Sequence, residues 1–258
     1  MLVDSHCHLN FPDLARNLDA ILANMRENGV GHALCVGVTL DEFPQVLAVA
    51  EAHPQVFASV GVHPDYEDQG EITVADLASR SAHPKVVAIG ETGLDYFRLK
   101  GDLHWQRERF RTHIRAAIEA NKPLIIHTRE AAEDTLQIMQ EEKAEKIGGV
   151  MHCFTESWEV AQQAMDMNFC ISFSGIVTFK NATALKAIAQ KVPLSRMLIE
   201  TDSPYLAPMP MRGKTNQPGY VRYIAQEIAD LRGIPYAEVE QATTENFFQL
   251  FHQAQPCS

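Results

Sequence analysis

The chain has 258 residues, a hydrophobic content of 46% and a formal charge of −11 at pH 7. The length suits one large domain or two small ones, and the hydrophobic content excludes a chain that is disordered throughout. The acidic balance, 33 Asp and Glu against 22 Lys and Arg, argues against a basic face that grips duplex DNA by its phosphates.

Short apolar runs recur along the chain and predict eight parallel strands. Several are rich in Val and Ile and lack polar alternation, which is typical of strands buried on both faces. In chain order the predicted strands cover residues 2–4, 33–36, 56–60, 86–89, 124–126, 149–151, 169–173 and 197–199.

Helical patterns lie between these strands. Apolar stripes with helical spacing occur at residues 18–25, 110–118, 132–139 and 221–231, and we interpret them as core packing. Residues 204–218, rich in Pro and Gly, are expected to form a long loop after the eighth strand. The predicted fold is a single (β/α)8 barrel domain spanning residues 1–258. An open doubly wound sheet is the alternative, but the GxGxxG loop typical of such sheets is missing from the sequence.

The cysteines and the first residues bear on the compartment. Five cysteines, an odd number, stand at positions 7, 35, 153, 170 and 257, and none forms a CxxC motif. We therefore expect free thiols and a cytoplasmic protein. The chain starts without the basic and apolar regions of a signal peptide, and no apolar run approaches about 20 residues, so no contact with a membrane is expected. The oligomeric state stays open, with a monomer favoured.

Ionisable residues follow almost every predicted strand at its C-terminal end, the face on which barrel enzymes build their active sites. These residues are His6 and His8 after the first strand, His63 after the third, Glu91 and Asp95 after the fourth, His127 and Arg129 after the fifth, His152 after the sixth, and Glu200 and Asp202 after the eighth.

The histidines of this group predict a metal site. His6 and His8 stand two residues apart on a strand, so both imidazoles point to the same side and can reach one ion. An HxH motif alone is weak evidence, but His127 and His152 also end buried apolar runs. Hydrogen-bonded core histidines are the alternative, and their number here argues against it. Imidazole ligands favour Zn, Mn and similar metals over Ca.

Four histidines exceed what a single catalytic ion with an open position needs, so we predict two divalent cations (Mg, Mn or Zn) bridged by Glu91. A buried salt bridge is the alternative role for Glu91. Asp202 is predicted to bind one ion and to accept a proton from metal-bound water. The hypothesis is that a hydroxide held between the metals attacks the substrate, with Glu91 and Asp202 as the catalytic carboxylates.

His63 and Arg129 are predicted to bind substrate, since each can donate a hydrogen bond to a phosphate oxygen. The alternative for Arg129 is an ion pair with Glu130 or Glu133 at a helix start.

Glu200 and Asp95 are predicted to orient metal ligands through hydrogen bonds. The remaining histidines are predicted to lie at the surface; they are His32, His53, His83, His104, His113 and His252.

Together these segments resemble the TatD family of metal-dependent deoxyribonucleases, within the amidohydrolase-like barrel superfamily. The resemblance runs from residue 2 to residue 251 and is carried by DSHCHL at 4–9, GVHP at 61–64, GETGLDY at 90–96, HTRE at 127–130, HCF at 152–154, SGIVTFKNA at 174–182 and ETDSPYLAP at 200–208.

The resemblance implies a (β/α)8 barrel that binds two divalent cations. It implies that His6 and His8 bind one ion and that His127 and His152 bind the other, with Glu91 as the bridge and Asp202 as ligand and base. It also implies a nuclease that acts on DNA ends, 3′→5′ on single strands, and this substrate rests on the resemblance alone.

One position departs from the family pattern. Members often have RGKxNEP after the eighth strand, whereas this chain has Gln217 where Glu is usual. A carboxylate role at this position is therefore in doubt. Arg212 and Lys214 remain and can meet substrate phosphates.

Two rival functions stay open. The same two-metal site can hydrolyse small esters or amides, and the acidic composition suits such substrates. A metal-binding protein without turnover is the other rival. Asp202 argues against the second rival, because binding alone needs no base at the eighth strand.

Overall fold

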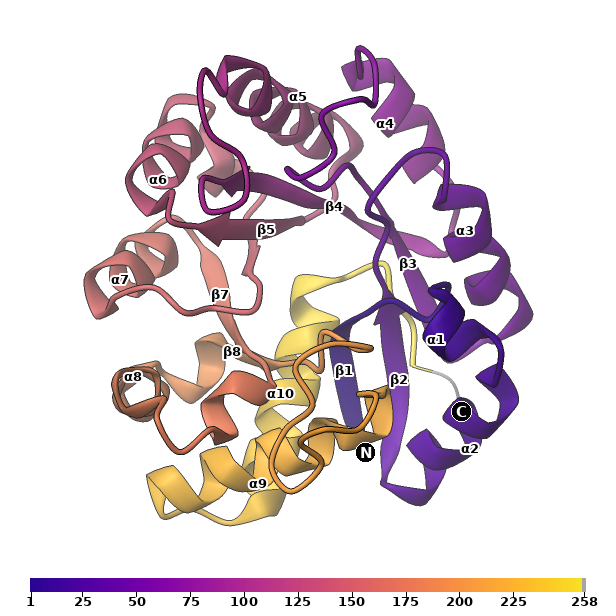
Figure 1. Cartoon of the computed structure of the whole chain (residues 1–258), viewed down its shortest axis with the longest axis vertical. Coiled ribbons are helices and arrows are strands. Elements are labelled where there is room, and N and C mark those ends of the chain that lie inside the picture. The colour runs from indigo at the N-terminus through magenta and orange to yellow at the C-terminus, as the bar shows by residue number, and fades with distance from the viewer. Residues whose placement is uncertain (257–258) are drawn as a thin grey trace.

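The computed structural model describes residues 1–256. Its eight strands form one parallel sheet in which neighbours along the chain are hydrogen-bonded. They are β1 (Leu2–Cys7), β2 (Val30–Cys35), β3 (Val56–Val60), β4 (Val86–Asp95), β5 (Leu124–Arg129), β6 (Gly149–Met151), β7 (Phe169–Phe173) and β8 (Met197–Ile199). A parallel bridge between Cys7 and Ser203 joins the two edges of the sheet, and the helices surround it (Figure 1). The predicted (β/α)8 barrel is confirmed.

The helices alternate with the strands. They are α1 (Pro12–Ala15), α2 (Leu18–Glu27), α3 (Phe43–Ala52), α4 (Val74–Ser81), α5 (His104–Ala120), α6 (Ala132–Glu141), α7 (Trp158–Asp166), α8 (Thr183–Lys191), α9 (Val221–Arg232) and α10 (Tyr236–Leu250), with 3-10 turns η1 (Ala144–Lys146), η2 (Gly175–Thr178), η3 (Leu194–Arg196) and η4 (Pro218–Tyr220). The four predicted apolar stripes fall in α2, α5, α6 and α9. The predicted loop is confirmed, since β8 is followed by no further helix or strand until η4.

The strands differ from prediction mainly in length. The bounds predicted for β3, β6, β7 and β8 are confirmed. In contrast, β1 continues past its predicted end to Cys7, which pairs with Cys35 of β2. β4 and β5 also continue past their apolar runs, because the ladder extends through polar residues as far as the pairing of Asp95 with Arg129. β2 starts three residues earlier than predicted and ends one residue earlier, and its early start follows from the pairing of Val30 with Leu2.

One end of the barrel is closed by α10. Apolar side chains such as Val3, Leu34 and Phe57 fill the barrel interior and pack against Phe247 and Phe251 of this helix. In Figure 1 the helix passes behind the strands, beside β1 and β8. Its Asn246 donates hydrogen bonds to the carbonyls of Leu194 and Met197, where β8 begins. The opposite, C-terminal end of the strands is therefore the end available for chemistry.

Two irregularities in the sheet set the direction of side chains at that end. β1 advances three residues from Asp4 to Cys7 while its partner β2 advances two, so β1 has one extra residue here. β4 has a similar extra residue between Ile89 and Thr92. Extra residues of this kind re-aim side chains at barrel rims. His6 lies in the first irregularity and Glu91 in the second.

The surface prediction was wrong for two histidines. His32 is buried, and its ring packs against Phe57 and Phe248. His113 is buried because it lies on the inward face of α5 between Phe110 and Ala117. His53 and His83 are half-buried, whereas His104 and His252 are exposed.

The expectation of free thiols is confirmed for Cys7, Cys35, Cys153 and Cys170, while Cys257 falls outside the described residues. Within residues 1–256, no helix is both long enough and apolar enough to cross a membrane.

Candidate metal centre

Glu91 lies at the middle of the predicted site, and only 3% of the residue is exposed. Its Oε1 is 2.8 Å from Nε2 of His152, and 3.3 Å from both Nδ1 of His127 and Nε2 of His63. Its Oε2 is 3.3 Å from Nε2 of His6. The two oxygens of one carboxylate therefore face different histidines, as a bridge between two ions requires.

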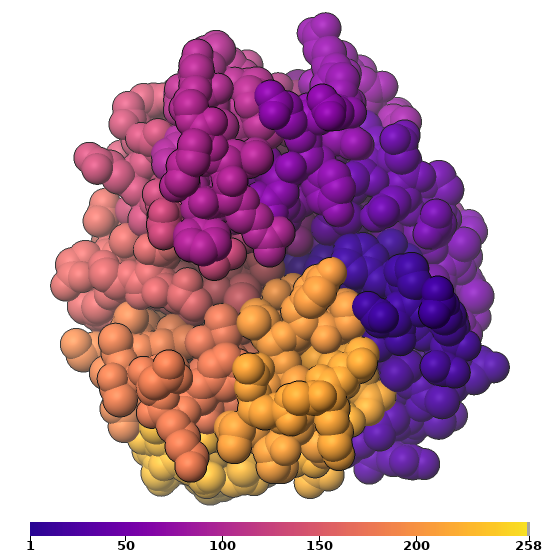
Figure 2. Space-filling model, viewed as in Figure 1, coloured from indigo at the N-terminus to yellow at the C-terminus, as the bar shows by residue number. Residues whose placement is uncertain are grey.

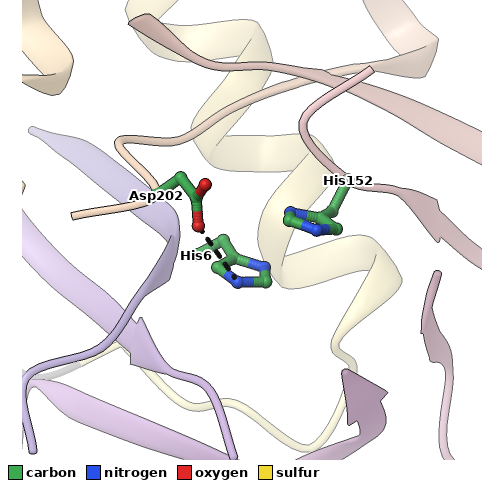
Figure 3. A group of neighbouring side chains, drawn as sticks. All are labelled: His6, His152 and Asp202. Atoms are coloured by element: carbon green, nitrogen blue, oxygen red, sulfur yellow. Dashed lines mark ion pairs between the residues drawn. The ribbon is translucent and has the colours of Figure 1, made fainter. Parts of the chain in front are cut away.

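A second carboxylate faces the histidines of β1. Oδ1 of Asp202 lies 3.5 Å from Nε2 of His8 and 3.7 Å from Nε2 of His6. Figure 3 shows the Asp202 carboxylate directed at the His6 ring, with the His152 ring on the other side of His6. The His6 and His152 rings stack with centroids 4.0 Å apart.

Hydrogen bonds on the outer side of the site fix the tautomers of three histidines. Nδ1 of His8 lies 3.1 Å from the carbonyl oxygen of Val36, which can only accept, so this nitrogen carries the proton. In the same way Nδ1 of His152 donates to Glu200 at 3.1 Å, and Nε2 of His127 donates to Asp95 at 3.0 Å. The other nitrogen of each ring, which is unprotonated when the imidazole is neutral, therefore points into the site.

His63 has the opposite arrangement. The backbone amide of Asp65 donates to Nδ1 of His63 at 3.1 Å, so the neutral ring carries its proton on Nε2, which faces Glu91. Burial lowers the pKa of His63 to about 3, which keeps the ring neutral. As it stands, His63 is a hydrogen-bond donor toward the site rather than an electron-pair donor to a metal.

These contacts fit bound cations. The inward nitrogens of His127 and His152 each face an oxygen of Glu91, so a proton or a metal ion must lie between them. Burial would lower the pKa of both rings, but the carboxylates around them raise it, which shows that this position attracts positive charge. Both ring nitrogens of His6 are buried, and neither has a hydrogen-bond partner within residues 1–256. Ligand atoms about 2.1 Å from a common ion lie about 3 Å apart, close to several of the separations found here.

Three overlapping groups of side chains can each gather around an ion. They are His6, His8 and Glu91; His6, His152 and Asp202; and His63, Glu91 and His127. The third group can do so through His63 only if the proton leaves Nε2 of this ring, which carries it in the arrangement described above. All six predicted ligands thus meet at one place.

The carboxylates of the site are ionised at neutral pH. Burial alone would raise the pKa of Glu91, but the neighbouring histidines, His152 foremost, hold it well below its usual value. The pKa of Asp202 is also lowered, because the hydrogen bond from His8 and the nearby His6 outweigh burial. Both groups are therefore ready to bind a cation or to accept a proton.

Arg129 does not form the ion pair considered above. Its guanidinium lies over the ring of Phe97, 3.7 Å from the centroid, and no carboxylate within residues 1–256 pairs with it. Glu130 instead meets Lys100 at 3.8 Å. Arg129 follows His127 by two residues on β5, so its charge remains available beside the site.

Sequence reasoning missed one buried pair that supports the site. Asp4 accepts hydrogen bonds from the backbone amide of Thr201 at 2.8 Å and from its hydroxyl at 2.6 Å. These bonds join β1 to the segment after β8. The DSHCH motif contains a signal for this pair. Asp4, His6 and His8 follow one another at intervals of two residues, so the side chain of Asp4 is expected on the same side of the strand as the two histidines.

A (β/α)8 barrel that gathers histidines and carboxylates at the C-terminal ends of its strands defines a barrel hydrolase of the metal-dependent class. Comparison with known proteins gives the family. The family model described as TatD related DNase matches residues 3–252, and the chain belongs to this family.

Relatives of this chain carry matching descriptions. It is 47% identical over 254 residues to the metal-dependent hydrolase YcfH of Escherichia coli (strain K12), covering 97% of this chain and 96% of YcfH. It is 44% identical over 252 residues to the metal-dependent hydrolase YabD of Bacillus subtilis (strain 168), covering 97% and 99%. Among solved structures, the TatD homologue YjjV of Escherichia coli K12 superposes with a TM-score of 0.90 at 28% identity, covering 97% of this chain and 98% of YjjV.

Proposed function

We propose that this protein is a two-metal nuclease that removes nucleotides 3′→5′ from single-stranded DNA ends. The observation that carries the proposal is the position of Glu91, whose Oε1 faces His127 and His152 while its Oε2 faces His6. A carboxylate placed in this way can share its two oxygens between two cations. Two-ion sites of this kind suit displacement at phosphorus.

His6, His8 and Asp202 would hold one cation, and His127 and His152 the other, with Glu91 between them. When bound, the cations would polarise the phosphoryl group, lower the pKa of a water molecule and attract an anionic substrate to this acidic protein. An imidazole-rich donor set favours transition metals such as Zn or Mn, and Mg is the alternative.

The remaining steps fall to side chains of the chain. Asp202 is ionised and lies beside His6 and His8, so it is placed to accept the proton of the attacking water. His63 directs its Nε2–H into the site and would donate it to a phosphate oxygen. Arg129 would bind the same or the adjacent phosphate.

The choice of DNA rests on the family, whose model carries the name DNase. A hydrolase of small esters or amides would use the same donors, so the test must include such substrates. Single-stranded oligonucleotides labelled at the 3′ or the 5′ end, and a panel of esters and amides, are incubated with protein of measured metal content, with and without Mg²⁺ or Mn²⁺.

We expect two equivalents of metal per chain. The 3′ label should be released first, and the 5′-labelled strand should shorten one nucleotide at a time. Chelation is expected to abolish both cleavage and DNA binding, since the protein carries a net charge of −11. Turnover of esters without cleavage of DNA would overturn the proposed substrate. Tight binding of DNA by the chelated protein would contradict the role given to the cations.

A further inference from the structure

Exposed apolar side chains gather at the end of the barrel that holds the metal centre. Among residues 1–256, the large apolar side chains that are exposed are Met1, Tyr66, Phe97, Tyr205 and Met209. All but Met1 lie in the loops that follow β3, β4 and β8. A concentration of this kind around an active site marks a binding surface.

Tyr205 is 57% exposed, yet it is anchored to the metal centre. Its backbone amide donates to the carbonyl of Asp202 at 3.0 Å, and its own carbonyl accepts a bond from Asn216 at 2.6 Å. Its ring meets Phe11 edge-on at 6.4 Å, and Phe11 stacks on the ring of His8 at 4.6 Å. The exposed face of Tyr205 is thus connected to a predicted metal ligand through one intervening ring.

Tyr66 approaches the same place from the loop after β3. Its ring meets that of His63 edge-on, with centroids 6.3 Å apart, and 38% of the residue is exposed. Its backbone carbonyl accepts a hydrogen bond from Arg109. Burial, Glu42 and the phenol of Tyr205 raise the pKa of Tyr66, so the two phenols are within electrostatic reach of each other.

The surface between these loops is open and is bordered by cations. Figure 2 shows it hollowed between the segment after β4 and the segment after β8. Arg212 and Lys214 of the latter segment are exposed, and like Arg129 they pair with no carboxylate within the part of the chain described. Exposed rings beside cations that have no carboxylate partner among the described residues suit a polyanion with flat, apolar groups, which describes a nucleic acid strand.

We propose that Tyr205, assisted by Tyr66 from the loop after β3, is the stacking site for the unpaired base next to the phosphate being cleaved. This inference rests on the proposed nuclease function and adds the residues that select the strand end. A base inside a duplex has both faces covered by its neighbours, whereas an unpaired base offers a face to Tyr205. The site therefore favours frayed or single-stranded ends without reading a sequence.

The test compares two oligonucleotides that differ only at the strand end. One ends in ordinary thymidines, and the other carries abasic tetrahydrofuran units in place of its last nucleotides. For the wild-type holoenzyme we expect kcat/KM to be about tenfold higher on the thymidine end, the size typical of one stacked base. Tyr205→Ala is expected to remove this preference, and Tyr205→Phe is expected to keep it.

Tyr236→Ala provides the matched control, because Tyr236 is a tyrosine of α10, the helix that closes the opposite end of the barrel. Its preference for the thymidine end should equal that of wild type. Circular dichroism and metal content of each variant report on folding. Cleavage of both substrates at equal rates, or an unchanged preference in Tyr205→Ala, would overturn the stacking site and leave the nuclease function standing. Absence of cleavage on both substrates would overturn the nuclease function, and the stacking site with it.

Discussion

The backbone amide of Asp202 donates a 2.9 Å hydrogen bond to the carbonyl of His6. The next bond along this seam runs from the amide of His8 to the carbonyl of Ser203, also at 2.9 Å. These bonds hold the segment after β8 against β1, where the barrel closes. The same residues carry three of the predicted metal ligands, so closure of the fold and geometry of the site depend on one seam.

The Asp4–Thr201 pair should matter for both properties. Thr201→Val keeps the shape of the side chain but removes the hydroxyl that donates to the buried Asp4 carboxylate at 2.6 Å. We expect a loss of about 2 kcal/mol in the free energy of unfolding, as is typical when a buried acceptor loses its donor. Urea unfolding measures it, with Thr112→Val as control, because that hydroxyl bonds only within its own helix, to the carbonyl of Glu108. Equal losses in the two variants would contradict a special role for the seam.

Asp202→Asn tests the proton acceptor. The amide keeps an oxygen near His8 and His6 but cannot take up a proton at neutral pH, so we expect kcat to fall by about 10² to 10⁴. Metal content, measured on the same preparation, separates this effect from the loss of an ion. Near-normal turnover with both metals present would contradict the role of Asp202 as base.

Glu200→Gln tests the outer support of a metal ligand. Glu200 is fully buried and accepts bonds from Nδ1 of His152 and from the amide of Cys153. Neutralising it makes the His152 ring less basic, and metal affinity is expected to fall about 10- to 100-fold. Competition with a chelator of known affinity measures the change, and Glu159→Gln, exposed on α7, serves as the matched control. An affinity equal to that of the control would show that Glu200 does not tune the site.

Much of this fold is predictable because the barrel strands are buried on both faces. Continuous apolar runs therefore mark them, and four of the eight strands have the predicted bounds. The polar ends of β4 and β5 escape this signal, since their ladder pairs charged residues such as Asp95 and Arg129. The position of the predicted ligands at one face followed from strand order alone.

Other features of the site depend on residues far apart in the sequence. Whether His63 donates a hydrogen bond or an electron pair depends on the amide of Asp65 and on no motif. The partner of Arg129 is Phe97, which lies in the loop after β4. The burial of His113 depends on which face α5 turns toward the barrel. Pattern reading finds such residues, but their partners appear only once the chain is folded.

His113 predicts a specific loss of stability in acid. Its Nδ1–H donates to the carbonyl of Arg109 at 2.8 Å, and its Nε2 accepts from the amide of Val62 at 3.0 Å. The bond from Val62 requires the neutral ring, because a protonated Nε2 cannot accept, and burial lowers the pKa of His113 from 6.5 to about 4. Between these pH values the unfolded chain binds a proton that the folded chain does not, so stability falls as the pH falls. The contribution is complete above pH 6.5 and is lost by pH 4, with a total of about 3 kcal/mol.

The variant His113→Asn offers an acceptor and a donor that do not titrate. Unfolding free energies of wild type and variant are measured from pH 7.5 to pH 4, and the difference between the two curves isolates this histidine from the other titrating groups. Wild type should lose stability more steeply, chiefly between pH 6.5 and pH 4. Parallel curves would mean that the ring accepts a proton in the folded state, and the amide of Val62 would then have a different partner.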